Sequence, residues 1–250
     1  MAVTSTDPRE PVLSGATVVV IGGSAGIGLE TARLARAESA EVILTGRNAD
    51  RLAQAAADLG AQRSAAFDAT DPAALERFFQ DLPGPVDHVM VTAGRPYYGL
   101  LADMDVEQAR RSFDEHMWLP INVARLATGR VRPGGTLIFM GGTGARRPHP
   151  GLTVAAMGTA ALPAMTANLA RELAPIRVNL IAAGFVDTPL SAQLLGDDLD
   201  RRRERLRATL PIGRVVGPAD VAALAVHLMV NTALTGATYD IDGGQQLLPG

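Results

Sequence analysis

The stretch Thr17–Gly28 reads Thr-Val-Val-Val-Ile-Gly-Gly-Ser-Ala-Gly-Ile-Gly, and it decides the fold. Its first five residues, Thr17–Ile21, form a short β-branched run that predicts a buried strand. Glycines follow at once, and apolar residues at helical spacing then predict a helix over Gly26–Ser39. A buried strand that passes through a glycine turn into a helix is typical of the first crossover in a parallel α/β sheet.

The same alternation of strands and helices continues along the chain. Further strands are predicted at Glu41–Thr45, Ala65–Phe67, Val86–Thr92, Thr136–Met140, Arg177–Ala182 and Thr238–Ile241. Further helices are predicted at Ala49–Leu59, Pro72–Gln80, Val106–Ala127, Val154–Leu173 and Pro218–Val230. Strands joined in this way need crossover connections, so we expect a doubly wound, Rossmann-type parallel sheet of about seven strands with helices on both faces.

The domain organisation follows from the absence of any linker or low-complexity stretch. Residues 1–14 are predicted to form a short N-terminal tail, and residues 15–250 a single domain. The segment Thr188–Leu210 is predicted to be an irregular, lid-like insertion, because long ordered connections are usually functional. The run Arg201–Arg207 inside it is interpreted as a solvated helix face.

Composition and charge exclude several classes of protein. Apolar residues at 47% and charged residues at 20% are ordinary globular values, and the net charge of -3 offers no basic surface for nucleic acid. The segment Met1–Leu13 lacks the features of a signal peptide, and no apolar run is long enough to span a membrane, so we expect a cytoplasmic protein that does not bind membranes. The sequence has no cysteine, and we expect neither a disulfide nor a metal site.

The turn after the first strand is predicted to bind phosphate. Glycine lets the backbone turn tightly and lets a pyrophosphate approach the amide groups. The helix that follows adds unpaired N–H donors and the positive end of its dipole. Because the turn Gly22–Gly28 stands between a strand and a helix, the sequence predicts a dinucleotide site here rather than a structural turn.

The end of the second strand indicates which dinucleotide binds. An acidic residue there would bind the ribose 2′-hydroxyl, whereas this chain has Arg47 after Thr45 and Gly46. A guanidinium can bind a 2′-phosphate, and we expect no carboxylate nearby to repel that phosphate. The sequence therefore favours NADP(H), although Arg47 could also be an ordinary surface arginine.

The spacing G-x-x-x-G-x-G resembles the short-chain dehydrogenase/reductase family, and further motifs extend the resemblance from Gly15 to Gly244. These motifs are Asp68 after the third strand, Ala93-Gly94 after the fourth, Ile176–Asn179, Gly184–Thr188 and Asp242–Gly244. The turn and the resemblance together imply that the cofactor site comprises Gly22, Ser24, Ala25, Gly26, Ile27, Gly28, Arg47, Asp68, Ala69, Ala93, Gly94, Ala183, Gly184, Val186 and Thr188. The chain departs from the family pattern at Ile21, Val91-Thr92 and Ala183, and these changes should weaken local hydrogen bonds without closing the pocket.

The resemblance fails at the active site. The family uses a tyrosine that exchanges a proton with the substrate oxygen, a lysine four residues later that lowers the tyrosine pKa, and a serine that polarises the carbonyl. These positions correspond to Ala155 for the tyrosine, Thr159 for the lysine and Gly142 for the serine. His116 stands at the position of the family's helix asparagine, and no tyrosine or lysine lies within Thr136–Pro175.

Two hypotheses about function remain open. In the first, the protein is an NADP-dependent oxidoreductase that acts on an unknown carbonyl or alcohol and uses a non-standard proton source. In the second, it is a pseudoenzyme, a cofactor-binding scaffold or sensor. His116 is the candidate acid because imidazole exchanges a proton near neutral pH, but a histidine at this position is also typical of a packed helix residue. A substrate with its own proton donor would need no relay.

Smaller features leave similar alternatives. Tyr97 and Tyr98 could face the pocket or stand at its rim, and the segment Arg146–His149 could bind an anionic substrate or be a solvated loop tip. The resemblance implies a homo-tetramer or homo-dimer that pairs through Val106–Ala127 and Val154–Leu173. Pro163 lies inside the second of these helices, so we expect a bend or a break there with a wider pocket beside it.

Overall fold

The computed structural model describes residues 11–146 and 148–248, and its centre is one seven-stranded sheet. The strand order is β3-β2-β1-β4-β5-β6-β7, and every pair is parallel. The strands are β1 Thr17–Ile21, β2 Glu41–Gly46, β3 Arg63–Ala66, β4 Val86–Val91, β5 Val131–Gly142, β6 Arg177–Ala183 and β7 Thr238–Ile241. The predicted doubly wound parallel sheet is confirmed.

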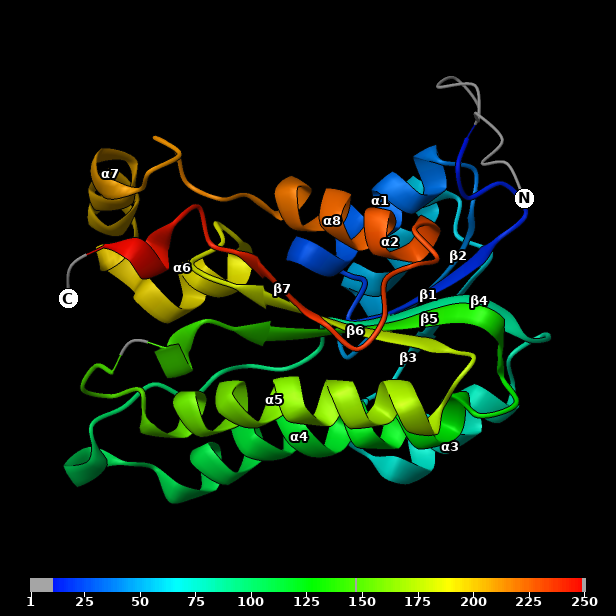
Figure 1. The fold of residues 1–250 in the computed structure, drawn as a ribbon, viewed down its shortest axis with the longest axis horizontal. Helices are drawn as coiled ribbons and strands as arrows, with labels where there is room; N and C mark the ends of the chain where they lie inside the picture. Colours follow the sequence, from blue (N-terminus) through cyan, green and yellow to red (C-terminus); the bar gives the residue numbers. More distant parts are fainter. Residues whose placement is uncertain (1–10, 147, 249–250) are drawn as a thin grey trace.

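Helices cover both faces of the sheet (Figure 1). The α-helices are α1 Gly26–Ala37, α2 Ala49–Leu59, α3 Pro72–Gln80, α4 Val106–Ala127, α5 Thr153–Glu172, α6 Pro189–Leu195, α7 Leu199–Thr209 and α8 Pro218–Val230. Short 3₁₀ helices occur at Leu101–Asp103, Gly144–Arg146, Gly196–Asp198 and Gln245–Leu247. Figure 1 shows α1, α2 and α8 on one face and α3, α4 and α5 on the other, with α6 and α7 beyond the ends of β6 and β7.

The strands form because their β-branched residues are buried on both faces. Residues of β1 alternate between two hydrophobic clusters: Val19 and Ile21 pack with α3, α4 and α5, while Val18 and Val20 pack with α1, α2 and α8. Val18–Ile21 are fully buried, and each of them pairs with β2 and β4. The middle of the sheet is therefore the rigid support for whatever lies at its carboxyl edge.

Polar side chains fix where several helices begin, and so where the loops at the sheet edge end. Asn48 accepts a hydrogen bond from the backbone N–H of Arg51 (2.8 Å) and caps α2. Asp71 caps α3 in the same way, with Pro72 at the first helical position. Thr188 caps α6, since its hydroxyl accepts from the N–H of Ser191 (3.2 Å).

The predicted irregular segment 188–210 is in fact mostly helical, and that part of the prediction is wrong. It contains α6 and α7, separated by one short 3₁₀ turn. A proline at the first position of α6 and a capping threonine before it favour the helix over a loop. The basic run Arg201–Arg207 does lie on a helix, as predicted. Its role as a lid stays a prediction.

Two further expectations differ from the structure. Helix α5 is continuous from Thr153 to Glu172, so Pro163 removes one hydrogen bond without the expected break in the helix, while the bend and the wider pocket stay predictions. Strand β5 begins at Val131, earlier than predicted, because Val131 pairs with Val86 of β4 despite the proline and glycines that follow it. In both places the surrounding packing overrides the local sequence preference.

The start of the described chain packs against the rest of the fold. Of the predicted tail, residues 1–10 lie outside the described residues. Leu13 is buried, and its N–H donates to the carbonyl oxygen of Glu38 (3.1 Å), so the chain is attached to the fold before β1 begins. No helix in the described residues is both long and apolar enough to cross a membrane.

A buried histidine gives the first prediction. His88 of β4 is 8% exposed, and its Nδ1 has no hydrogen-bond partner. Burial, helped by the positive charge of Arg177 and opposed by Asp87, lowers the pKa of His88 to about 4. Between pH 6.5 and 4 the unfolded chain therefore binds more protons than the folded one, and stability falls as the pH falls. We expect a loss of about 2 kcal/mol from this group between pH 7 and pH 5.

Urea unfolding of the wild type and of His88→Leu at both pH values measures this loss. The variant should lack about 2 kcal/mol of the wild type's pH dependence, whereas the exposed control His149→Asn should keep it. Identical pH dependence in the wild type and His88→Leu would contradict the assignment.

Candidate functional site

The turn between β1 and α1 is packed so closely that glycine is required at two positions. Gly22 has a positive φ of 98°, and a Cβ built on it would lie 2.7 Å from the backbone nitrogen of Ala93. A Cβ on Gly28 would lie 2.3 Å from the carbonyl oxygen of Gly22. The hydroxyl of Thr92 donates to the carbonyl oxygens of Ile21 (3.2 Å) and Gly22 (3.1 Å) and ties β4 to the turn.

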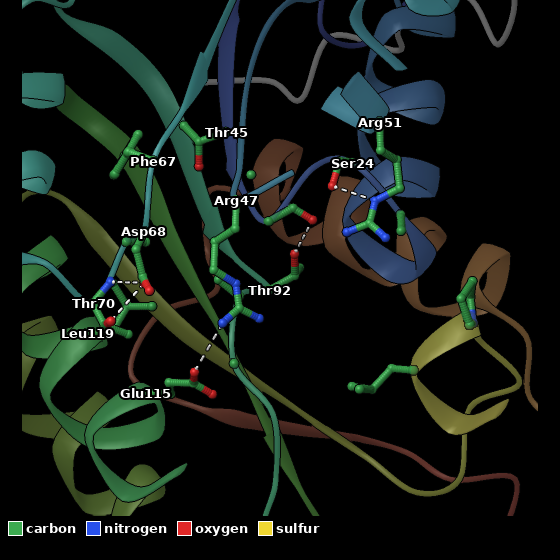
Figure 2. A pocket seen from close by; sticks show the side chains of 18 of the residues that line it. Ser24, Thr45, Arg47, Arg51, Phe67, Asp68, Thr70, Thr92, Glu115 and Leu119 are labelled. Atoms are coloured by element: carbon green, nitrogen blue, oxygen red, sulfur yellow. Dashed lines mark hydrogen bonds and ion pairs between the residues drawn. The ribbon is translucent and has the colours of Figure 1, made fainter. Parts of the chain in front are cut away.

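A cavity opens beside this turn, at the carboxyl ends of β1, β2, β3 and β4 (Figure 2). Eight of the predicted cofactor residues line it: Gly22, Ser24, Ala25, Arg47, Asp68, Ala69, Ala93 and Gly94. It is also lined by residues that the sequence did not predict to bind the cofactor: Thr45, Gly46, Arg51, Phe67, Thr70, Thr92, Glu115, Leu119, Pro189, Leu190 and Gln193. The last three belong to α6, which therefore closes one side of the cavity.

The surroundings of Arg47 differ from the expectation that no carboxylate lies near it. Nη1 of Arg47 lies 3.7 Å from Oε1 of Glu115, which comes from α4. Figure 2 shows Arg47 extending across the cavity towards Glu115. The two residues are far apart in the sequence, and α4 reaches this place only when β4 is paired beside β1, so no local pattern could have indicated the contact.

A second arginine lies on the same side of the cavity as the glycine turn. Nε of Arg51, in the first turn of α2, donates to the hydroxyl oxygen of Ser24 at 3.4 Å. Ser24 is buried, whereas the side chain of Arg47 is 62% exposed. A basic residue one turn into the helix after the second strand was the available sequence signal for Arg51. Together, Ser24, Arg47 and Arg51 provide donors for a phosphate at the end of β2.

Asp68 lies at the end of β3 on the other side of Arg47. Its Oδ1 accepts hydrogen bonds from the backbone N–H of Thr70 (3.0 Å) and from the Thr70 hydroxyl (2.7 Å). Partial burial raises the pKa of Asp68, but these hydrogen bonds and the positive charges of Arg47 and Arg111 outweigh it, and the net shift is downward. The cavity therefore holds an ionised carboxylate here at neutral pH.

The remaining predicted cofactor residues are not among those that line the cavity; they lie at the start of α1 and at the end of β6 or in the loop after it. A Cβ on Gly26 would lie 3.5 Å from Cβ of Thr188, so the loop after β6 packs against the glycine turn. Val186 is buried, and its carbonyl oxygen accepts from the hydroxyl of Ser191 (2.5 Å). Ile27 and Gly28 lie in the first turn of α1. Ala183 is the last residue of β6, and Gly184 is the first residue of the loop that follows.

The positions of the missing active-site residues do converge. A Cβ on Gly142, at the end of β5, would lie 3.3 Å from Cγ2 of Thr159. The Thr159 hydroxyl donates to the carbonyl oxygen of Ala155 (3.0 Å) and accepts from the N–H of Ala145 (3.0 Å). That hydroxyl is therefore engaged within the protein. Thr143, buried beside Gly142, is a hydroxyl residue that the sequence reasoning passed over.

His116 reaches this region from α4. Its Nδ1 lies 2.7 Å from the carbonyl oxygen of Ser112, which can only accept, so Nδ1 carries a proton and Nε2 has the free lone pair in the neutral ring. A Cβ on Gly94 would lie 3.6 Å from Nε2, and one on Gly158 would lie 3.9 Å from Cβ of His116. The ring thus lies between the loop after β4 and helix α5. To donate a proton from Nε2 it must first take one up.

The other candidate residues have internal partners or stand at the surface. The Tyr97 hydroxyl accepts from the N–H of Asp105 (2.8 Å), and Tyr98 is 54% exposed. Arg146 pairs with Asp240 and donates to Gln246 (2.9 Å). Arg147 lies outside the described residues, and the exposed His149 contacts the carbonyl oxygen of the next residue.

Helix α7 is tied to the loop after β6. Arg203 donates from Nε (2.9 Å) and Nη2 (2.7 Å) to the two oxygens of Asp187, and from Nη1 to Asp200 (2.9 Å). The guanidinium of Arg202 lies 5.9 Å from the centre of the Phe185 ring. These contacts hold the segment 188–210 against the loop that borders the cavity.

Comparisons with known proteins agree with this geometry. The family model described as enoyl-(acyl carrier protein) reductase matches residues 22–246. The chain belongs to the short-chain dehydrogenase/reductase family. A short-chain dehydrogenase/reductase named ATR9, from Stachybotrys chlorohalonatus, is 29% identical over 94% of this chain and 98% of its own.

Solved structures place the fold in the same short-chain dehydrogenase/reductase family. One, a small-chain dehydrogenase in complex with NADPH, is 30% identical with a TM-score of 0.80 and covers 93% of this chain and 99% of its own. Another, BdcA in complex with NADPH, is 27% identical with a TM-score of 0.84 and covers 93% of this chain and 95% of its own.

Residue counts in this short-chain dehydrogenase/reductase chain bear on the active-site positions that the sequence predicts to be altered. The 250 residues include no lysine at all, so all 23 residues of the combined lysine and arginine count are arginine. The three tyrosines are Tyr97, Tyr98 and Tyr239, and none is on α5. The family's cofactor turn is thus present without its tyrosine and lysine.

The close packing of the turn gives the second prediction. Gly28→Ala forces a Cβ against the Gly22 carbonyl, and overpacking of this kind typically costs about 1–3 kcal/mol. Thermal unfolding should show that loss. The matched control is Gly84→Ala, where nothing lies within 4 Å of the added Cβ and the change should be within about 0.5 kcal/mol. Equal melting temperatures for the two variants would contradict this packing argument.

Proposed function

We propose that the protein binds NADP(H) across the carboxyl ends of β1–β4 and acts as an oxidoreductase without the family's serine–tyrosine–lysine relay. One observation carries the proposal: the cavity beside the glycine turn is lined by Ser24, Arg47 and Arg51, in a chain that has no lysine and no tyrosine on α5. Two similar proteins have been solved with NADPH, which supports the choice of cofactor.

The residues present fit the phosphates of such a cofactor. The amino end of α1 begins at Gly26 without a side-chain cap, which leaves backbone N–H groups free for a pyrophosphate. No aspartate or glutamate stands within the first turn of α1 to oppose that charge. At the far end, the guanidinium groups of Arg47 and Arg51 and the hydroxyl of Ser24 would hold the 2′-phosphate.

The nicotinamide end would lie between the loop after β6 and the space beside Ala155. Gly184, Val186 and Thr188 would border it, and the ion pair of Asp187 with Arg203 keeps their loop in place. When bound, NADPH supplies the hydride. Because hydride chemistry belongs to the cofactor, the loss of the tyrosine does not remove it. What this chain contributes is the positioning of the two reacting groups.

Protonation of the substrate oxygen is the step for which this chain offers the fewest candidate groups. Thr159 uses its hydroxyl internally, and Ala155 and Gly142 have no proton to give. His116 is the proposed substitute acid, since its Nδ1 lies against the Ser112 carbonyl oxygen, which leaves the lone pair of Nε2 on the side of the loop after β4. A substrate that brings its own acidic group, or that becomes neutral on accepting hydride, needs no help from the protein.

The second candidate function is that of a pseudoenzyme, which binds NADP(H) but catalyses nothing. The observation in its favour is that the hydroxyl at the lysine position holds the loop after β5 in place of serving a substrate. The two candidates share their cofactor site and differ only in turnover. A panel of ketones, quinones and imines, together with direct measurement of cofactor binding, separates them.

The choice of cofactor gives the third prediction. Because Arg47 would bind the 2′-phosphate, NADPH should bind at least tenfold more tightly than NADH, about 1.4 kcal/mol. Fluorescence titration of both cofactors measures this, and Arg47→Ala should remove most of the difference. Equal affinities in the wild type, or a preference that survives Arg47→Ala unchanged, would contradict the assignment.

The missing relay gives the fourth prediction. Simple ketones should be reduced about a hundred- to ten-thousand-fold more slowly than by family members with the tyrosine, because no tyrosine can protonate the alkoxide. With a hydride acceptor that the wild type does turn over, His116→Ala should abolish activity while cofactor binding stays unchanged. Ordinary turnover of simple ketones would refute the loss of the relay, and full activity in His116→Ala would refute the role of the histidine.

Assembly gives the fifth prediction. Helices α4 and α5 carry exposed large apolar side chains, namely Val106 (50%), Trp118 (56%) and Met157 (56%). An exposed apolar surface of this kind supports a homo-dimer or homo-tetramer formed through these helices. Sedimentation velocity at micromolar concentration should show the oligomer, and Trp118→Arg should weaken it. A wild-type protein that sediments only as a monomer would refute the proposal.

A further inference from the structure

One wall of the nucleotide cavity is helix α6, and apolar packing does little to hold it there. Pro189, Leu190 and Gln193 of this helix line the cavity, yet none of its seven residues is buried. Helix α7, which follows after one 3₁₀ turn, buries a single side chain, Leu206. Because burial of an apolar face is what usually fixes a helix to a fold, the placement of α6 and α7 depends strongly on their polar contacts.

The best-formed of these polar contacts joins α7 to the base of α6. Arg203 of α7 donates from Nε (2.9 Å) and Nη2 (2.7 Å) to the two oxygens of Asp187, which directly precedes Thr188, the cap of α6. Both side chains are only 29% exposed. Most surface ion pairs contribute little to stability, but a bidentate pair of arginine and carboxylate is the exception. The pair therefore ties α7 back to the start of α6.

The two ends of this ion pair are held very differently. The backbone N–H of Asp187 donates to the carbonyl oxygen of Val216 (2.9 Å), and Val186 forms a β-bridge with Val216. Both valines are buried in the hydrophobic cluster that includes α8. Figure 1 shows α7 beyond the ends of β6 and β7, outside the helix layers that cover the sheet. When the pair breaks, Asp187 stays with the core and α7 is the part that is free to move.

We propose that Arg203 is the latch of the nucleotide cavity: its ion pair with Asp187 holds α6 and α7 closed, and this pair must break before a dinucleotide enters or leaves. Arg203 is a positioning residue, because it acts on the nucleotide only through Asp187 and the wall formed by α6. The proposal rests on the proposed function, since it requires that NADP(H) occupies the cavity that α6 lines.

The latch has a kinetic consequence that a binding residue would not have. The residues described as lining the cavity include neither Asp187 nor Arg203, so the pair contributes equally to the closed form with and without the nucleotide. A contact that contributes equally to two states does not change the equilibrium between them. Loss of the pair should therefore speed entry and exit by the same factor and leave the Kd unchanged.

Stopped-flow fluorescence of the full chain with NADPH measures both rates. Association is followed on mixing, and dissociation is followed when excess NADP⁺ displaces the bound NADPH. In Arg203→Gln we expect both rate constants to rise about fivefold or more, while the Kd stays within about twofold of the wild-type value. Asp187→Asn breaks the same pair from its other end and should give the same result, so the test stands even if one of the two variants does not fold.

A second carboxylate on the same guanidinium supplies the matched control. Nη1 of Arg203 donates to Asp200 (2.9 Å), which lies within α7 and is exposed. Asp200→Asn removes this contact without releasing α7 from Asp187, so both rate constants should stay at the wild-type values. In the double variant Asp187→Asn/Arg203→Gln the acceleration should equal that of either single change, because both changes remove one shared interaction.

The possible failures point to different steps. Wild-type rate constants in both Arg203→Gln and Asp187→Asn, or an equal acceleration in Asp200→Asn, overturn the latch. A Kd that rises in both variants while the association rate stays unchanged also overturns it, because that result describes damage to the bound state alone. A wild type that binds no NADPH overturns the proposed function instead.

Discussion

The structure depends on the contact between the end of β1 and the start of α1. Gly28 packs on the carbonyl oxygen of Gly22, and Gly22 in turn packs on the backbone of Ala93, with no space for a side chain at either glycine. Thr92 bonds both β1 and the turn, and so fixes β4 to the same point. Because of this one junction, α1 begins at the sheet edge with its free N–H groups directed to the cavity, and the ends of β2 and β3 converge beside it.

The sequence predicted what is local and missed what is assembled over long distances. The strands of the sheet follow from β-branched runs such as Val18–Ile21, and the phosphate turn follows from glycine spacing. The contact of Arg47 with Glu115 was not foreseen, because it requires α4, packed on one face of the sheet, to bring Glu115 to the end of β2. The hydrogen bond from Arg51 to the hydroxyl of Ser24 was missed for the same reason, since the two residues lie on different elements.

The boundaries of several helices and strands show the same difference between local sequence signals and long-range contacts. The first half of β5 contains residues that disfavour strands, yet Val131 is held by its pairing with β4. Helix α5 continues through Pro163, although a proline removes one hydrogen bond and usually bends a helix. Helix α6 has only seven residues, and α7 has eleven but a single buried side chain, Leu206, so neither shows apolar periodicity; the capping threonine and the proline of α6 were the only local signals. At β5 and α5, packing decided the outcome and propensity did not.

The central claim is that an intact NADP(H) site survives beside an active site that has lost its proton relay. A crystal structure of the protein grown with NADP⁺ tests it most directly. The account predicts the pyrophosphate at the amino end of α1, the 2′-phosphate within hydrogen-bond distance of Arg47, and the nicotinamide beside Ala155 and Gly142. Crystals grown at millimolar NADP⁺ that show no nucleotide in this cavity, with Arg47 still against Glu115, would contradict it.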